Sequence, residues 1–348
     1  WLHLTLIVDG IDMKLYLDDQ LIGHNKNVKR EIVELGKELK SYLGRSFYNG
    51  DTYFKGAFDN IKVYNRVLSD SELKGEETDS EYNAGYLWTF FDSSDGYEKI
   101  FLGYSKDGLT WEKLNKDEDG NAQPILVNDA QGSDLGVRDP HIIRSKEGDK
   151  YWILGTDLHA EGGGSGGSGW DQINASQNLV VWESTDLVNW SEPQLVYAGF
   201  DNAGCVWAPE AIYDEATDDY LVYWSSRDKS KNGTDQNALR VYVCRTKDFH
   251  TFSEPKVWLS EDQDTGNEVN IIDSTIVKSD GKFYRFSTSD WNTVIDVSNS
   301  LSEDVFDVRQ GEESSENGDW KRIVKRSESS QAGFDRREGF TVYQLPDG

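Results

Sequence analysis

The sequence feature that most constrains the fold is a phrase that occurs four times, in which an acidic residue opens an apolar, strand-like run. The phrases are RDPHII, APEAIY, IDSTIV and REGFTVY, with the acids Asp139, Glu210, Asp273 and Glu338. These acids are 71, 63 and 65 residues apart, about the length of a four-stranded antiparallel unit. Pro140 keeps Asp139 out of the helical region and suits the start of a strand. The spacing therefore predicts a repeated four-stranded sheet.

Two further phrases recur in the same part of the chain. One is a strand closed by a turn, in FLGYSKDGLTW (101–111), VVWESTDLVNW (180–190) and VYVCRTKDFHTF (241–252). The other is an aromatic strand, in YLWTFF, KYWILGT, DYLVYWSS and KFYRFSTS. Radial repetition of four-stranded sheets is a β-propeller, and the first strand of every sheet then lines the central channel. We therefore expect an all-β fold in which the four acids converge near one axis.

The chain is predicted to contain two modules. LHLTLIV and MKLYLDD flank the turn signal DGID, which indicates a β-hairpin near the start. The expected boundaries are 1–75 for a first β module, 76–84 for a linker that takes in most of the polar run KGEETDSEYN (74–83), and 85–348 for the repeats. GGGSGGSGW (162–170) has the composition of a linker, but it lies between two strands of one repeat, which favours a loop over one face.

Composition limits the partners. The chain carries 36 basic and 63 acidic residues, a net charge of −27, so phosphate is repelled and nucleic acid or an anionic membrane is a poor partner. No apolar run reaches about 18 residues, so membrane insertion is not expected. Abundant aromatic residues suit neutral ligands such as sugars, although they could equally form core. Cys205 and Cys244 are interpreted as two buried thiols. The chain opens in mid-strand, and we expect it to be a fragment.

The recurring acids have a chemical explanation and lack a structural one. Placing several carboxylates together is costly, because like charges raise at least one pKa. A glycosidase uses such a group, since one carboxylic acid protonates the leaving oxygen while a carboxylate acts on water or the anomeric carbon. A third acid can keep the proton donor protonated near neutrality.

The phrases RDPHII, VWAPEAIYD, NIIDSTIV and REGFTVYQL resemble the blade-opening motifs of family 43 glycoside hydrolases, the arabinofuranosidase, xylosidase and arabinanase group, over roughly residues 85–348. The resemblance implies a five-bladed β-propeller that hydrolyses glycosidic bonds with inversion. It implies Asp139 as the catalytic base, Asp273 as the residue that modulates the pKa, and Glu338 as the general acid. GAFDNIKVYNRVLSDSEL (56–73) resembles the end of laminin-G/concanavalin-like jelly-roll modules, about half of which is present.

The motifs depart from the family pattern in three places. IDST lacks the usual Pro after the acid, EGF has Phe340 where Pro is usual, and WAPE has Glu210 after its Pro. Glu210 is the alternative to Asp273, but we expect Trp207 and Glu210 to line the pocket, Trp207 by stacking on a sugar. His159 is expected near the same site. Five blades of about 65 residues need more than residues 85–348 provide, so part of the fourth blade and the closing strand are expected to be absent.

No cofactor is expected, with a structural calcium ion in the propeller channel left open. NKDEDGNAQPIL (115–126) matches the opening of a calcium loop, but Leu126 stands where a bidentate Glu is required, which favours an acidic hairpin turn. The five histidines have no HExxH spacing, so a catalytic metal is not expected.

The leading hypothesis is an inverting glycosidase that acts on arabinose- or xylose-containing plant glycans, outside or on the surface of a bacterial cell. A fructan-cleaving five-bladed hydrolase is one alternative, but its WMNDPNG-like strand and Glu-Cys motif are missing. A non-catalytic glycan-binding propeller is the other.

Overall fold

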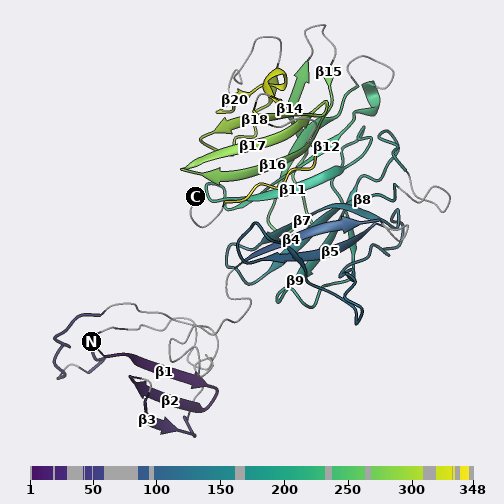
Figure 1. Ribbon diagram of the computed structural model, residues 1–348. Coiled ribbons are helices and arrows are strands. Elements are labelled where there is room, and N and C mark those ends of the chain that lie inside the picture. Colours follow the sequence, from purple (N-terminus) through teal and green to yellow (C-terminus); the bar gives the residue numbers. More distant parts are fainter. Residues whose placement is uncertain are drawn as a thin grey trace. The chain divides into compact units, whose positions relative to one another are not determined.

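The computed structural model of the chain is shown in Figure 1. It describes residues 2–18, 20–29, 42, 44–48, 50–58, 85–93, 98–160, 169–231, 237–262, 268–308, 319–330, 332–333 and 338–344. The chain divides into two compact units, Trp1–Asn83 and Ala84–Gly348. In the described ranges the regular elements are β-strands and two short 3-10 turns, η2 (Lys229–Lys231) and η3 (Arg326–Glu328). The prediction of an all-β fold is confirmed.

The first unit contains an antiparallel meander of β1 (Leu4–Asp9), β2 (Asp12–Leu17) and β3 (Gln20–Asn25). The hairpin predicted at DGID is present, because Asp9 pairs with Asp12 across a turn in which Gly10 has a positive φ of 56°. The segment 59–73 of the jelly-roll resemblance and the predicted linker 76–84 lie outside the described residues.

Within the described residues of the second unit, four sheets follow one another along the chain (Figure 1). The first sheet consists of β4 (Tyr86–Asp92), β5 (Lys99–Ser105) and β6 (Glu112–Lys113). The second is the meander β7 (Val137–Arg144), β8 (Tyr151–Asp157), β9 (Asn178–Ser184) and β10 (Gln194–Tyr197).

The third sheet consists of β11 (Trp207–Asp214), β12 (Asp219–Ser226), β13 (Arg240–Thr246), β14 (Lys256–Asp262) and β15 (Glu268–Val269), with β19 (Phe306–Val308) parallel to β14. The fourth consists of β16 (Ile271–Ser279), β17 (Lys282–Ser289), β18 (Asn292–Ser298) and β20 (Lys321–Val324). Neighbouring strands are otherwise antiparallel, as the repeat predicted.

The first strands of the four sheets, β4, β7, β11 and β16, lie side by side (Figure 1). Thr89 Oγ1 donates to the carbonyl of Pro140 at 3.0 Å, which links β4 to β7, and His141 Nε2 lies 2.9 Å from the carbonyl of Ala211, which links β7 to β11. These strands therefore follow one another in the order β4, β7, β11 and β16, as the first strands of successive sheets in a propeller do.

Residues 338–348 were predicted to supply a further first strand, but the described part of this segment, 338–344, runs without strand pairing. The backbone N–H of Gly339 donates to Asp273 Oδ2 in β16 at 3.1 Å. At the other end, the Tyr86 hydroxyl of β4 donates to the carbonyl of Gln344 at 3.0 Å. The segment thus connects the last sheet to the first and is a fifth element beside the axis. A fifth blade is not seen in the described residues, where the sheets do not close into a ring.

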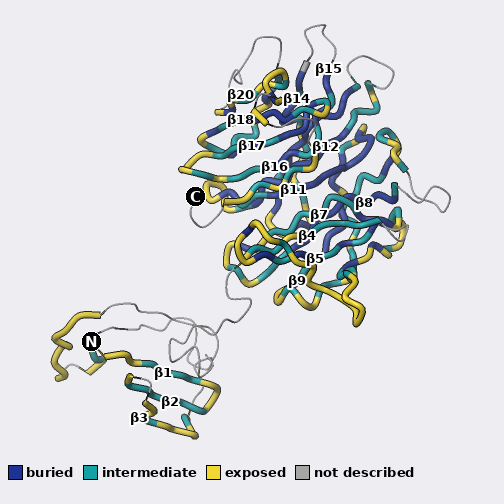
Figure 2. The backbone as a smooth tube through the Cα atoms, viewed as in Figure 1, coloured by how far each residue is buried: buried dark blue, intermediate teal, exposed yellow. Residues whose placement is uncertain are grey.

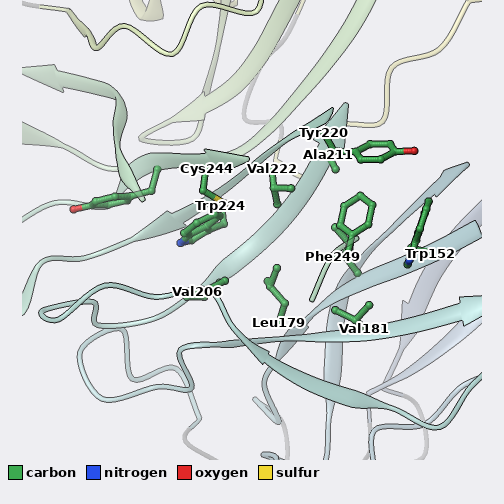
Figure 3. Close-up of a cluster of buried hydrophobic side chains, with 13 residues drawn as sticks. Trp152, Leu179, Val181, Val206, Ala211, Tyr220, Val222, Trp224, Cys244 and Phe249 are labelled. Carbon is green, nitrogen blue, oxygen red and sulfur yellow. The ribbon is translucent and has the colours of Figure 1, made fainter. Parts of the chain in front are cut away.

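The core lies between adjacent sheets. In the largest cluster, Trp152 of β8 packs against Phe249, which follows β13, with ring centroids 4.9 Å apart (Figure 3). Aromatic contacts of this kind fill the space between neighbouring sheets and add to the free energy of burial. Figure 2 shows buried residues concentrated in the strands of the second unit, whereas the strands of the first unit are half-buried or exposed.

The strand-and-turn phrase repeats because it builds one kind of turn three times. Asp186 Oδ1 accepts the backbone N–H groups of Val188 at 2.9 Å and Asn189 at 2.7 Å. Asp107 and Asp248 accept the corresponding pairs of N–H groups. An Asp side chain that holds the backbone two and three residues on is a favoured turn former, so these acids are structural.

Candidate active site

The strands β7, β11 and β16 carry the same irregularity near their start. Their pairing with the next strand skips from Arg138 to His141, from Trp207 to Glu210 and from Ile272 to Thr275. Each is a β-bulge, which redirects a side chain and is common next to active sites.

The first skipped residue of each bulge has a left-handed backbone. The φ angles are 49° at Asp139, 51° at Ala208 and 54° at Asp273. A positive φ is strained for a residue with a Cβ, and such strain persists only where the surrounding structure holds it. The repeat therefore fixes one position on each of three strands, and two of the three residues there are aspartates.

The positions of the bulges differ from the sequence alignment in which Asp139, Glu210 and Asp273 were equivalent. Asp139 corresponds to Ala208, because both are the first skipped residue of their bulge, and Glu210 corresponds to His141 instead. Ala208 lies 69 residues after Asp139 and 65 before Asp273, and Glu338 lies another 65 residues on. The third sheet, which begins with β11, therefore has no carboxylate at the shared position.

The bulges meet at a cavity of about 440 Å³. Asp139, Asp273 and Glu338, which are far apart in the sequence, all line this cavity. Trp207 also lines it, and its side chain is buried. The structure thus brings together the three residues predicted to be catalytic and one of the three predicted to bind substrate.

The carboxyl of Asp139 is held by a short chain of hydrogen bonds. Thr156 Oγ1 donates to Asp139 Oδ2 at 2.9 Å, and the backbone N–H of Ala208 donates to Thr156 Oγ1 at the same distance. Burial raises the pKa of Asp139, while the Thr156 hydrogen bond and the neighbouring Arg138 charge lower it. Two opposing influences therefore act on this acid, and the second favours its ionised form.

The other two acids interact with Asp139 and with each other. Burial raises the pKa of Asp273 well above its ordinary value, and the charges of Asp139 and Glu338 raise it further. The pKa of Glu338 is raised by burial and then by Asp139, and Arg138 opposes this rise. Like charges in one site disfavour simultaneous ionisation, so the group of three acids gives up its last proton at a higher pH than an isolated carboxyl does.

Arg138 was not predicted as a site residue, yet it lines the cavity. Its guanidinium carbon lies 4.5 Å from the ring centre of Phe91 and 4.5 Å from that of Trp170. Its Nη1 is 3.6 Å from Oε1 of Glu98, whose side chain is fully buried. Two rings and a carboxylate thus hold this cation next to the acids.

Further lining residues come from loops. Arg227 Nε donates to Gln172 Oε1 at 2.5 Å, its Nη2 donates to Asn270 Oδ1 at 3.1 Å, and its Nη1 donates to the carbonyl of Asn237. Arg227, Gln172 and Asn270 all line the cavity, as does Trp291. Their positions depend on how loops meet, which no local sequence pattern specifies.

Glu210 and His159 are not among the residues that line the cavity. Glu210 Oε2 accepts the Tyr223 hydroxyl at 3.1 Å, and burial raises the pKa of Glu210 to about 8. His159 is buried, with its Nε2 3.7 Å from Glu98 Oε2. Substrate-binding roles for these two residues stay predictions.

The described ranges contain no group of three or more His, Cys, Asp or Glu side chains arranged to hold a metal ion. In the segment that resembled a calcium loop, Asp117 Oδ1 accepts the backbone N–H groups of Asp119 at 3.1 Å and Asn121 at 2.8 Å, as in an acidic turn. The described ranges also contain no helix with the length and apolar character to cross a membrane.

Family models account for both units. The glycosyl hydrolase 43-related model, described as a probable glycosyl hydrolase domain, matches residues 81–348. A model of the concanavalin A-like lectin/glucanase superfamily matches residues 1–74. The chain therefore belongs to the glycosyl hydrolase 43-related family and carries a concanavalin A-like module before that domain.

An alpha-L-arabinofuranosidase of Bifidobacterium longum subsp. longum is 35% identical over an alignment of 236 positions that covers 62% of this chain and 20% of that protein. The chain thus spans about a fifth of that relative's length. An endo-1,4-beta-xylanase from Bacteroides thetaiotaomicron is 13% identical, with 77% of this chain and 79% of that chain covered and a TM-score of 0.48. An exo-1,5-alpha-L-arabinanase from a bovine ruminal metagenomic library is 15% identical, with 74% of each chain covered and a TM-score of 0.44.

Proposed function

We propose that this chain is the catalytic part of an inverting glycoside hydrolase that acts on arabinose- or xylose-containing plant glycans. The observation that carries the proposal is the convergence of Asp139, Asp273 and Glu338, from three distant parts of the chain, on one cavity. Membership of a glycosyl hydrolase family and similarity to an arabinofuranosidase support the same reaction and substrate class.

In the proposed reaction Asp139 is the base and Glu338 is the acid. A water oxygen forms a bond to the anomeric carbon as Asp139 takes its proton, and the bond from that carbon to the leaving oxygen breaks as Glu338 donates a proton to it. Water attacks the face opposite the leaving group, so the configuration inverts. Asp273, whose pKa both other acids raise, is the modulator that keeps one proton within the group.

The surroundings of the two acids suit these roles. Burial raises the pKa of Asp139, while the Thr156 hydrogen bond and the Arg138 charge oppose that rise and support the ionised form that a base requires. Glu338 has a pKa raised by burial and by Asp139, which supports the protonated form that an acid requires. Because plant polysaccharides are too large to cross a bacterial envelope intact, we place the enzyme outside the cell or on its surface.

The proposal is tested by the hydrolysis of 4-nitrophenyl α-L-arabinofuranoside and 4-nitrophenyl β-D-xylopyranoside, with proton NMR to identify the first anomer released. We expect release of the inverted sugar, and a loss of at least about 1,000-fold in kcat/KM for Asp139→Asn, because the attacking water then has no base. Glu338→Gln should lose as much on arabinopentaose or xylopentaose, whose leaving oxygen needs a proton, and less on the aryl glycosides, because 4-nitrophenolate leaves without one. Asp119→Asn, in a surface turn, is the control and keeps the parent rate.

Three results would contradict the proposal. Asp139→Asn could retain the parent rate, the first product could have the retained configuration, or fructose could be released from sucrose in place of a pentose. Oligosaccharide binding without turnover would instead favour the non-catalytic glycan-binding alternative.

A further inference from the structure

The turn between β17 and β18 contains a residue that suits its backbone poorly. Ser289 pairs with Asn292, and the two residues between them, Asp290 and Trp291, have φ angles of 43° and 67°. A two-residue hairpin turn with both φ angles positive favours Asp or Asn first and Gly second. A bulky residue in that conformation is an outlier, because its Cβ crowds the backbone.

The same sheet shows what an unstrained version looks like. Its other hairpin, between β16 and β17, has Asp280 and Gly281 in the turn, with φ angles of 49° and 74°. A Cβ built on Gly281 would have no atom within 4 Å, so space does not decide the choice of residue there. The two turns lie at opposite ends of the sheet. The turn between β17 and β18 lines the cavity and has Trp291 at its second position, where the turn between β16 and β17 has Gly281.

Packing does not explain the tryptophan. The Trp291 side chain is 62% exposed, so it buries little apolar surface on folding. The turn itself is firmly held, because the Asp290 N–H donates to the carbonyl of Asn270 at 3.0 Å and Asn292 Nδ2 donates to the carbonyl of Asp290 at 2.8 Å. The fold thus holds Trp291 with a strained backbone and an exposed ring. Residues that oppose the local backbone preference without a gain in packing are concentrated at functional positions.

Trp291 lines the same cavity as Asp273 and Glu338. A tryptophan ring offers a large, rigid apolar face, which matches the C–H face of a sugar ring and loses little entropy on binding. We propose that Trp291 is a stacking platform for an uncharged glycosyl residue of the substrate, further out than the residue whose bond is cleaved. This inference rests on the proposed function for the substrate class, and it adds a position that selects oligosaccharides over monosaccharides.

The test measures binding and stability together. In an Asp139→Asn background, isothermal titration with linear arabinopentaose and xylopentaose gives the affinity, and thermal unfolding gives Tm. We expect Trp291→Gly to weaken the binding of the preferred pentasaccharide by about tenfold. We also expect its Tm to rise by about 2–4 °C, because glycine relieves the strained backbone. Trp291→Ala should weaken binding equally without raising Tm.

The matched control places a tryptophan in the hairpin turn at the other end of the sheet. Gly281→Trp places the same ring in the same kind of turn at the other end of the sheet, so it should lower Tm and leave the affinity unchanged. The inference is overturned if Trp291→Gly binds both pentasaccharides as tightly as its parent, if it lowers Tm, or if the Asp139→Asn parent binds neither sugar. If the chain with Asp139 intact fails to hydrolyse aryl glycosides while Trp291→Gly still weakens binding, the proposed function fails and this inference stands.

Discussion

Replacing Thr156 with valine removes one hydroxyl from the chain of hydrogen bonds that holds the proposed base. Thr156 is fully buried, and valine has nearly the same shape, so the change is confined to the contact at 2.9 Å with Asp139 Oδ2 and the contact at 2.9 Å with the Ala208 N–H. The Thr156 hydrogen bond lowers the pKa of Asp139, so its loss raises that pKa.

The size of the effect follows from the charge on the acceptor. A hydrogen bond to a charged group contributes about 1.5–3 kcal/mol, and about 1.4 kcal/mol corresponds to a factor of ten. The ratio of ionised to protonated Asp139 should therefore fall by roughly 10- to 100-fold at a given pH. On the acid side of the pH profile, where kcat/KM follows that ratio, the rate falls by the same factor and the acid limb moves to higher pH.

The assay is kcat/KM for an aryl glycoside measured from acid to neutral pH. The valine variant should also lose about 1–3 kcal/mol of stability, because the Ala208 N–H is left without its acceptor. Thr156→Ser keeps the hydroxyl and should keep the position of the acid limb, which separates hydrogen bonding from packing. An acid limb that stays in place in a folded Thr156→Val protein would refute this account of Asp139.

Two further predictions concern acids outside the catalytic group. Backbone N–H groups of Thr110 and Leu109 lower the pKa of Asp107 to about 2, so its stabilising effect is present above the unfolded-state pKa of about 3.9 and is lost as the pH falls through 2. Asp107→Asn should therefore lower Tm at pH 7, and the difference from the parent should disappear near pH 2; a constant difference would contradict the turn's role. Glu210, with a pKa of about 8, is mostly protonated at neutral pH, so Glu210→Gln should change kcat/KM less than about threefold. A loss above tenfold would indicate substrate contact.

Much of the architecture could be predicted because strands and their turns are local in sequence. The hairpin at DGID and the aromatic strands follow from side-chain alternation and turn residues, which act within a few positions. The convergence of Asp139 and Asp273 followed from the repeat, because equivalent positions on first strands point toward one axis.

The remaining features depend on tertiary contacts. The bulge in β11 puts a left-handed φ at Ala208, and nothing in an alanine signals that conformation, so matching the acids placed Glu210 two residues out of register. Arg227 reaches the cavity through contacts with Gln172 and Asn270 from other loops. Trp291 did leave a signal, since tryptophan follows aspartate where a hairpin turn favours glycine.

The segment 338–344 can reach its place in the fold only after the first and last sheets have been synthesised, because it contacts both. Its contact between Tyr86 and Gln344 joins positions 258 residues apart, and its Gly339 amide meets Asp273. During synthesis, β7 and β16 emerge and can associate well before Glu338 leaves the ribosome. A nascent domain would thus hold the proposed base while still lacking the proposed acid, and the two would come together only when the segment 338–344 docks against β4 and β16.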